Sequence, residues 1–129
     1  MKKFYGTAGK LFSLCLTGLL MTGCGREEAV SFSQDVRPIL DWHCIECHRV
    51  GGSGLEASGF SMETYDALMK GTNFGPMIIP GDAEGSNILV LMEGRADPSI
   101  SMPHGYRKPV AAQDIQTIRL WIGQGAKNN

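Results

Sequence analysis

The sequence lacks several features that would place it in common functional classes. It has no apolar run long enough to cross a bilayer as a stable helix, no internal repeat and no β-hairpin signal. It also has no basic surplus, since 12 Lys and Arg stand against 13 Asp and Glu. This balance provides no basic patch for nucleic acid. What remains is a chain of 129 residues, 43% hydrophobic and 19% charged, which is one small globular domain at most.

The first 23 residues have the composition of an export signal. Residues 1–10 carry three lysines and no acid, and residues 11–21 form an apolar stretch that is followed by small residues. The next residues, Thr22, Gly23 and Cys24, resemble the lipobox of bacterial lipoproteins. This resemblance implies that the signal is cleaved before Cys24 and that Cys24 is lipidated, which would anchor the domain lastingly to a membrane. An uncleaved N-terminal anchor and a soluble secreted protein are the alternatives.

Maturation at Cys24 would change the counts of charge and cysteine. Removing residues 1–23 takes away three lysines and no acid, so the formal charge changes from -1 to -4, with 9 basic residues against 13 acidic ones. The folded domain then keeps only Cys44 and Cys47 as free cysteines. We therefore expect three parts: a signal peptide over 1–23, a polar tether over 24–31 and a folded domain over 32–129.

Helical stretches separated by glycine and proline are predicted in the mature chain. The 17 glycines indicate a loop-rich fold, and the glycine-rich segment 51–59 is expected to be a loop. Asp35, Ser61 and Asp82 are the expected N-caps of the first three helices. Because no strand signal is found, the predicted fold class is all-α. The four helices are expected over about 35–47, 61–71, 83–94 and 110–125.

The segment from Cys44 to His48, Cys-Ile-Glu-Cys-His, carries the strongest chemical signal. Two cysteines at i and i+3 with a histidine at i+4 present both sulfurs and the imidazole to one planar object. That is the geometry for attaching haem c, in which the thiols bond to the two vinyl groups and His48 coordinates the iron. Export favours this interpretation, because haem c is attached outside the cytoplasmic membrane in bacteria.

Three other uses of these residues compete with haem attachment. A thioredoxin-like dithiol needs a strand before its first cysteine, and none is predicted there. A structural zinc site needs four ligands, and the domain has no second cysteine pair. A disulfide between Cys44 and Cys47 would close so short a loop that it would stabilise little. Haem attachment is therefore the main hypothesis, and a zinc site or a redox dithiol is the alternative.

The sixth position on a haem iron can be filled or open, and several side chains are candidates. Met69 and Met92 lie on apolar helical faces, where core packing is the usual role of methionine. His43 directly precedes the attachment cysteines, so the chain would have to double back to bring it to the opposite haem face. Met102 lies in a proline-rich loop that can be laid across the haem, and His104 is its rival. The remaining candidates are Met62 and Met77, and an open site is the other possibility.

The order of motifs resembles the class I cytochrome c superfamily, and more closely its planctomycete-type branch. The segments that carry the resemblance are DVRPIL before the cysteine motif, PGDAEGSNIL and MPHG after it, and IRLWIGQGA at the end, so it spans residues 32–126. It implies a small fold of about four helices wrapped around one covalently attached haem c. It also implies that Cys44 and Cys47 bind haem, that His48 is the proximal ligand and that Met102 is the distal ligand.

We therefore expect a mono-haem c-type cytochrome that transfers single electrons and is not an enzyme, because His48 and Met102 leave no free site on the iron. We expect it in the periplasm or another extracytoplasmic compartment, anchored by lipid, with redox proteins such as a dehydrogenase or a respiratory complex as partners. An open or labile sixth site would instead indicate a haem sensor or a peroxidase-like protein. A third hypothesis is an interaction module in which haem only stabilises the fold.

Overall fold

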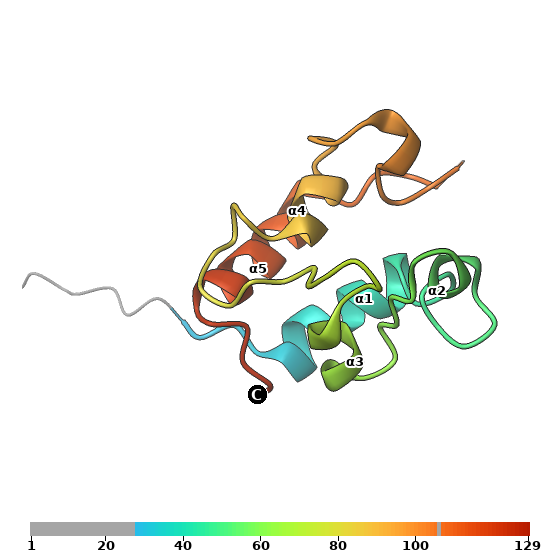
Figure 1. Ribbon diagram of the computed structural model, residues 1–129. Helices are drawn as coiled ribbons and strands as arrows, with labels where there is room; N and C mark the ends of the chain where they lie inside the picture. Colours follow the sequence, from blue (N-terminus) through green and yellow to red (C-terminus); the bar gives the residue numbers. More distant parts are fainter. Residues whose placement is uncertain (1–27, 106) are drawn as a thin grey trace, which may run out of the picture.

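The computed structural model describes residues 28–105 and 107–129, which form helices joined by irregular segments (Figure 1). A π-helix, η1 (Phe32–Val36), continues directly into α1 (Arg37–His43). A short 3-10 helix, η2 (Pro98–Ile100), interrupts the long connection between the last two α-helices. The described residues contain no β-strand, only two isolated β-bridges, so the all-α fold class is confirmed. The other helices are α2 (Ser53–Ser58), α3 (Tyr65–Lys70), α4 (Asn87–Met92) and α5 (Ala112–Gly123).

The chain enters the domain through a capped first turn. The hydroxyl of Ser31 accepts a hydrogen bond from the Gln34 backbone N–H at 3.2 Å, and the Asp35 carboxylate accepts one from the Ser31 N–H at 2.7 Å. The two side chains therefore satisfy backbone donors reciprocally. Pro38 lies in the first turn of α1, where its missing N–H costs least. The prediction of Asp35 as the N-cap was wrong, because Asp35 lies inside η1 and Ser31 is the cap.

The N-caps of two further helices also differ from the prediction. α3 begins after Thr64, whose hydroxyl accepts a first-turn backbone N–H at 3.1 Å, and not after Ser61. α4 begins after Ser86 instead of Asp82, whose carboxylate accepts a backbone N–H three residues later at 2.8 Å. Each segment offers more than one side chain that can cap, and packing of the apolar residues decides which turn starts the helix.

The glycine-rich segment 51–59 contains α2, so the prediction of a loop there was wrong. Its first turn is held by an earlier part of the chain, because the Leu55 N–H donates to the Cys47 carbonyl at 3.0 Å. Gly59 ends the helix in the left-handed conformation, with φ of 73°. The described residues therefore form five α-helices, where the sequence predicted about four.

The core is built where η1, α4 and α5 meet. The rings of Phe32 and Trp121 lie 5.4 Å apart, and the ring of Tyr65 meets Phe32 edge-on at 5.1 Å. On α5 the side chains of Ile118 and Ile122 are fully buried with Trp121, as the apolar pattern of the last helix predicts. The other buried core residues include Val36, Leu40, Leu68, Ile78, Ile88, Leu89 and Met92.

A network of ion pairs joins α5 to α4 and to the segment before α4. Arg119 pairs with both Glu84 and Glu93, and Arg95 donates to Glu93 at 2.6 Å. Burial alone would raise the pKa of Glu93, but the hydrogen bonds from Arg95 and Arg119 outweigh it and hold that pKa below its ordinary value. The network therefore fixes the end of α4, from which the loop toward α5 departs.

Candidate functional site

The cysteine motif forms a tight turn at the end of α1. Cys44 is the C-cap of this helix, and its backbone N–H donates to the Leu40 carbonyl at 2.9 Å. The N–H groups of Cys47 and His48 both donate to the Cys44 carbonyl, each at 3.1 Å. Both cysteine side chains are half-buried and are free thiols. The fold therefore brings the two sulfurs and the imidazole together on one turn.

His48 is a buried histidine whose ring is held by the backbone. Its side chain is only 7% exposed, and its Nδ1 lies 2.9 Å from the carbonyl oxygen of Phe60. The Phe60 ring lies edge-on to the imidazole, with centroids 5.3 Å apart. When Nδ1–H donates to this carbonyl, Nε2 is the nitrogen that remains for a metal, and a carbonyl partner of this kind orients metal-bound histidines.

Two glycines let the backbone approach the histidine closely. A Cβ on Gly54 would lie 2.8 Å from Cε1 of His48 and 2.9 Å from the Cys47 carbonyl oxygen. A Cβ on Gly52 would lie 2.4 Å from the same carbonyl oxygen. The start of α2 therefore packs on the turn of Cys44 to His48, in a space that no side chain could share.

The electrostatics of the turn disfavour a reactive dithiol. Burial is the main influence on Cys44, and it raises the pKa of this thiol to about 11, although the nearby charge of Arg107 lowers it in part. A thiol with so high a pKa is protonated at neutral pH, whereas the nucleophilic cysteine of a thioredoxin-like motif has a lowered pKa. The structure gives no support to the redox-dithiol alternative.

The loop between α4 and α5 folds back over the turn of Cys44 to His48, which we call the attachment turn. The Met102 backbone N–H donates to the Leu91 carbonyl at 3.1 Å, which ties the loop to α4. Further along the loop, Arg107 forms an ion pair with Glu46, which lies between the two cysteines. The loop, the end of α1 and the turn line an open pocket of about 410 Å³, whose lining residues are Trp42, His43, Glu46, Pro103, Arg107 and Lys108.

The other candidate ligands have different environments. His43 is turned toward α5, where its Nε2 lies 3.3 Å from a carboxylate oxygen of Asp114. Met69 packs against the core from α3 and is partly buried. Met102 is half-buried and His104 is exposed, so both remain available in the loop, and the identity of the distal ligand stays a prediction. Three methionines are buried in the core: Met62, Met77 and Met92.

The placement of the donor side chains in the described residues does not suit zinc. Within residues 28–105 and 107–129, no group of three or more His, Cys, Asp or Glu side chains is placed to hold a metal ion. Cys44, Cys47 and His48 share one turn but do not converge on a common point that such an ion could occupy. Three donors spread along a turn are the arrangement expected for a planar ligand that bonds to each of them at a different position.

Comparison with known families supports the interpretation from the motif. Residues 44–104 match the family model described as planctomycete cytochrome C. The chain carries a planctomycete-type cytochrome c domain. The match begins at the first attachment cysteine and ends in the loop that carries Met102, so it covers both parts of the candidate site. Comparisons with curated proteins and with solved structures gave no match.

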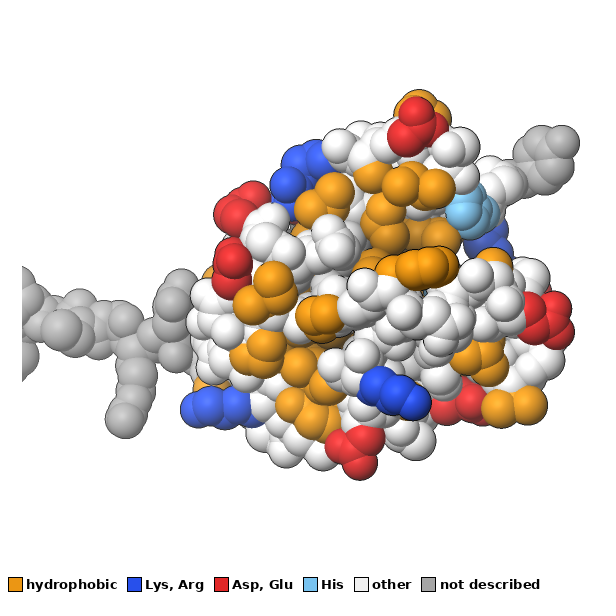
Figure 2. Space-filling view, in the orientation of Figure 1, with side chains coloured by type: hydrophobic (Ala, Val, Ile, Leu, Met, Phe, Trp, Pro, Cys, Tyr) orange, Lys and Arg blue, Asp and Glu red, His pale blue; other side chains and the backbone are white. Residues whose placement is uncertain are grey.

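A cytochrome c domain implies covalently bound haem c, and the described residues fit this group. The two thiols are free, and His48 is buried with its Nδ1 already bonded to the Phe60 carbonyl. The backbone of Gly54 packs against Cε1 and Nδ1 of the imidazole and so helps to hold the ring in place. Figure 2 shows hydrophobic side chains gathered on the face between the loop of residues 95–105 and the helices α1 to α3, as an apolar porphyrin requires.

Domains of this family act in electron transfer and are usually extracytoplasmic. In the part of the chain that the structure covers, no helix has both the length and the apolar character needed to cross a bilayer.

Sequence reasoning missed the residue that orients His48. The contribution of Phe60 is a backbone carbonyl, and every residue type has one, so no signal in the sequence could have identified it. Glu46 and Arg107 were missed for a different reason. Their pairing joins positions 61 residues apart, which only the fold reveals.

Proposed function

We propose that this protein is a membrane-anchored, mono-haem c-type cytochrome that transfers single electrons on the extracytoplasmic face of a membrane. The observation that carries the proposal is the buried His48, held through Nδ1 by the Phe60 carbonyl, on the same turn as two free thiols. Bound haem c would supply exchange of one electron between ferric and ferrous iron. No catalytic role is proposed for any residue.

Each residue of the site has a distinct role in this proposal. Cys44 and Cys47 would hold the haem through thioether bonds, and His48 would offer Nε2 to the iron. The Phe60 carbonyl keeps the imidazole in one tautomer and makes Nε2 more basic. Met102 offers its thioether from the loop, which would favour ferrous iron and leave no position open for an external ligand.

The proposed distal ligand is tested by replacing Met102 with leucine, which keeps the volume and removes the sulfur. We expect the ferrous wild-type protein to bind no carbon monoxide and the Met102→Leu protein to bind it readily, as shown by the absorption spectrum. Met69→Leu is the matched control, because Met69 is also partly buried but packs against the core. An unchanged low-spin spectrum in Met102→Leu would reject Met102, and His104→Ala would then be measured in the same way.

The same measurement separates the electron carrier from a haem sensor or a peroxidase-like protein. Ready formation of a carbon monoxide complex by the wild-type protein would indicate an open or labile sixth site. A carrier with both axial positions filled should instead exchange electrons quickly and reversibly at an electrode without binding the gas. Slow or irreversible exchange would favour the third hypothesis, in which haem only stabilises the fold.

The proposed anchor rests on the lipobox-like residues that end at Cys24, which lie outside the described residues, as does the signal peptide over 1–23. We expect mass spectrometry of the mature protein from its native membrane to show a chain that begins at Cys24 and carries both a diacylglyceryl group and haem. Cys24→Ala should abolish the lipid and leave the haem. A mature protein without lipid would reject the anchor but would leave the assignment of haem unaffected.

A further inference from the structure

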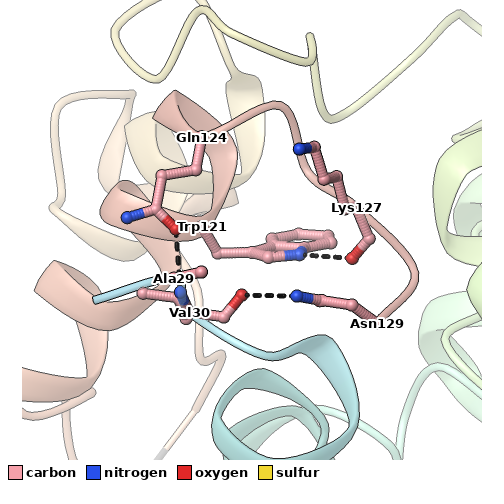
Figure 3. Close-up of a pocket in the computed structure, with 6 residues that line it drawn as sticks. All are labelled: Ala29, Val30, Trp121, Gln124, Lys127 and Asn129. Carbon is pink, nitrogen blue, oxygen red and sulfur yellow. Dashed lines mark hydrogen bonds between the residues drawn. The ribbon is translucent and has the colours of Figure 1, made fainter. Parts of the chain in front are cut away.

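The segment that leads into the domain is bonded along its length to residues 124–129 (Figure 3). The side chain of Gln124 accepts from the Val30 N–H at 2.8 Å and donates to the Glu28 carbonyl at 3.2 Å. The side chain of Asn129 accepts from the Phe32 N–H at 2.9 Å and donates to the Val30 carbonyl at 3.3 Å. The Asn129 carbonyl also accepts from the Ser33 N–H at 2.9 Å. We call residues 28–33 and 124–129 together the clamp.

The clamp is part of the packed domain. The Phe32 ring lies on Trp121, whose indole N–H donates to the Lys127 carbonyl at 2.8 Å. The hydroxyl of Tyr65 donates to the Ala126 carbonyl at 2.7 Å, so α3 also holds this segment. The clamp borders a cavity of about 280 Å³, which Figure 3 shows beside Trp121. The chain is therefore fixed to the body of the domain from Glu28 onward.

The clamp leaves little chain between the domain and the proposed anchor. Only four peptide units separate Cys24 from Glu28, and a fully extended chain of that length spans at most about 14 Å. A compact domain of about 100 residues has a radius of gyration of about 13 Å, which corresponds to a sphere about 33 Å across. A link of this length is too short for the domain to turn its opposite end toward the membrane.

The attachment turn lies away from the clamp, farther than the link to Cys24 can reach. Twelve residues of continuous helix, the π-helix η1 followed by α1, separate Phe32 from Cys44. At no more than about 1.5 Å per residue, they displace the turn by up to about 18 Å along the helix axis. Figure 1 shows the entering chain on one side of the molecule and α2, which follows His48, on the other side.

We propose that the clamp holds the domain with residues 28–33 and 124–129 toward the bilayer and with the turn of Cys44 to His48 toward the aqueous phase. This inference rests on the proposed lipid at Cys24 and the proposed haem. It assigns the partner to one class: a protein, soluble or projecting from the membrane, that reaches the haem from water. A small redox carrier dissolved in the lipid is excluded. Each encounter moves one electron between the two redox centres and makes or breaks no bond.

The orientation is tested with the lipidated, haem-loaded protein on a supported bilayer, by polarised absorption of the haem. We expect an ordered haem in the native protein. The comparison protein carries an insertion of about 20 Gly and Ser residues after Glu27, which gives a flexible link of about 25 Å. We expect the haem of this comparison protein to show no preferred orientation. The double variant Gln124→Ala, Asn129→Ala tests the clamp itself and should show partial loss of order. Equal polarisation in the native and inserted proteins would overturn the proposal.

The partner class is tested by reducing the ferric protein in vesicles with ascorbate from water or with a long-chain quinol in the bilayer. We expect ascorbate to reduce the native and inserted proteins at the same rate. We expect the quinol to reduce the native protein at least about tenfold more slowly than the inserted one. In the native protein the link is too short to let the haem reach the bilayer, so the effective concentration of the haem at the quinol is very low. Equal rates of reduction by the quinol in the native and inserted proteins would overturn the inference about orientation. Mass spectrometry would still show the haem and the lipid in that case, so the proposed function would stand. Absence of either group from the purified protein would reject the proposed function itself.

Discussion

The space beside His48 is set by a residue that has no side chain. Gly54 lies in the first turn of α2, and an added Cβ would come within 3.0 Å of two atoms of the imidazole. The backbone at Gly54 is not in the left-handed region, so a substitution there acts through space and not through backbone strain. The bond from Nδ1 to the Phe60 carbonyl depends on the ring position that Gly54 permits.

We predict that Gly54→Ala moves the imidazole, weakens its bond to the Phe60 carbonyl and destabilises the domain by about 2 kcal/mol, as overpacking usually does. The reduction potential and the electron paramagnetic resonance spectrum of the haem should both change, because the carbonyl tunes the basicity of the ligand. Gly123→Ala is the control, since a Cβ there meets nothing within 4 Å. The prediction fails if the two variants have the same potential and the same spectrum.

Residue patterns identified the parts of the site that are local in the chain. The spacing of Cys44, Cys47 and His48 is visible in the sequence because one turn contains all three. The Phe60 carbonyl lies twelve residues from His48, and it orients the ring through a backbone atom that every residue carries. Sequence could therefore predict which atoms bind, but not what holds them in place.

At the scale of elements, Ser86 connects the start of α4 to the turn before it. Its side chain is fully buried, accepts from the Ile79 N–H at 2.9 Å and donates to the Asp82 carbonyl at 2.7 Å. We predict that Ser86→Ala lowers the free energy of unfolding by about 2 kcal/mol, because both backbone groups lose their partner in a partly buried site. Urea denaturation measures the change. Ser53→Ala, at an exposed helix position, should stay within about 0.5 kcal/mol of the wild type, and a similar value for Ser86→Ala would contradict the assigned role.

The ion pairs between α4 and α5 predict a dependence of stability on pH. Glu93 has a folded pKa below its ordinary value of 4.5, so its contribution is fully present above that value and is lost as the pH falls through the folded pKa. We predict that Glu93→Gln costs about 1 kcal/mol at pH 7 and that the difference from the wild type disappears toward pH 3. Denaturation curves at several pH values measure this difference.

The comparison with the variant is needed because other carboxylates also contribute to acid sensitivity. The pKa of Asp41 is likewise lowered, by its hydrogen bond with Arg37, so the wild-type curve alone cannot identify Glu93. The exposed Glu56→Gln variant is the control and should follow the wild type at every pH. A constant difference between wild type and Glu93→Gln down to pH 3 would show that packing, and not charge, is responsible.

Helix positions were predicted better than helix starts. The apolar pattern of α5 was found because twelve residues give several turns of periodicity. The starts of η1, α3 and α4 were misplaced, since each has two or three residues nearby that could cap. α2 was missed because it has six residues, and a carbonyl from the attachment turn holds its first turn. Short helices of this kind depend on tertiary contacts that a local pattern does not contain.

At the scale of the whole molecule, the described part of the chain has little regular structure to support itself. Only α5 reaches twelve residues, and the other α-helices have six or seven. Isolated helices of such lengths are unstable in water, so tertiary burial must stabilise them. Trp121 and Ile122 anchor one end of the core against η1. In contrast, residues 95–105 and 107–110 meet the attachment turn around an open pocket and through the pair of Arg107 with Glu46.

This imbalance predicts that the domain depends on its covalent haem for a cooperative fold. In a Cys44→Ala, Cys47→Ala double variant without haem, we expect a loss of at least about 3 kcal/mol and a midpoint of thermal unfolding lower by more than about 10 °C, because a small domain loses the apolar body of its core. Hydrogen exchange should leave protection in η1 and α5, around Phe32 and Trp121, and remove it from α2 and from residues 95–105 and 107–110. Near-ultraviolet circular dichroism should fade while the far-ultraviolet signal persists. A double variant that unfolds as cooperatively as the wild type, with a similar midpoint, would show that the packing around Trp121 alone stabilises the whole domain.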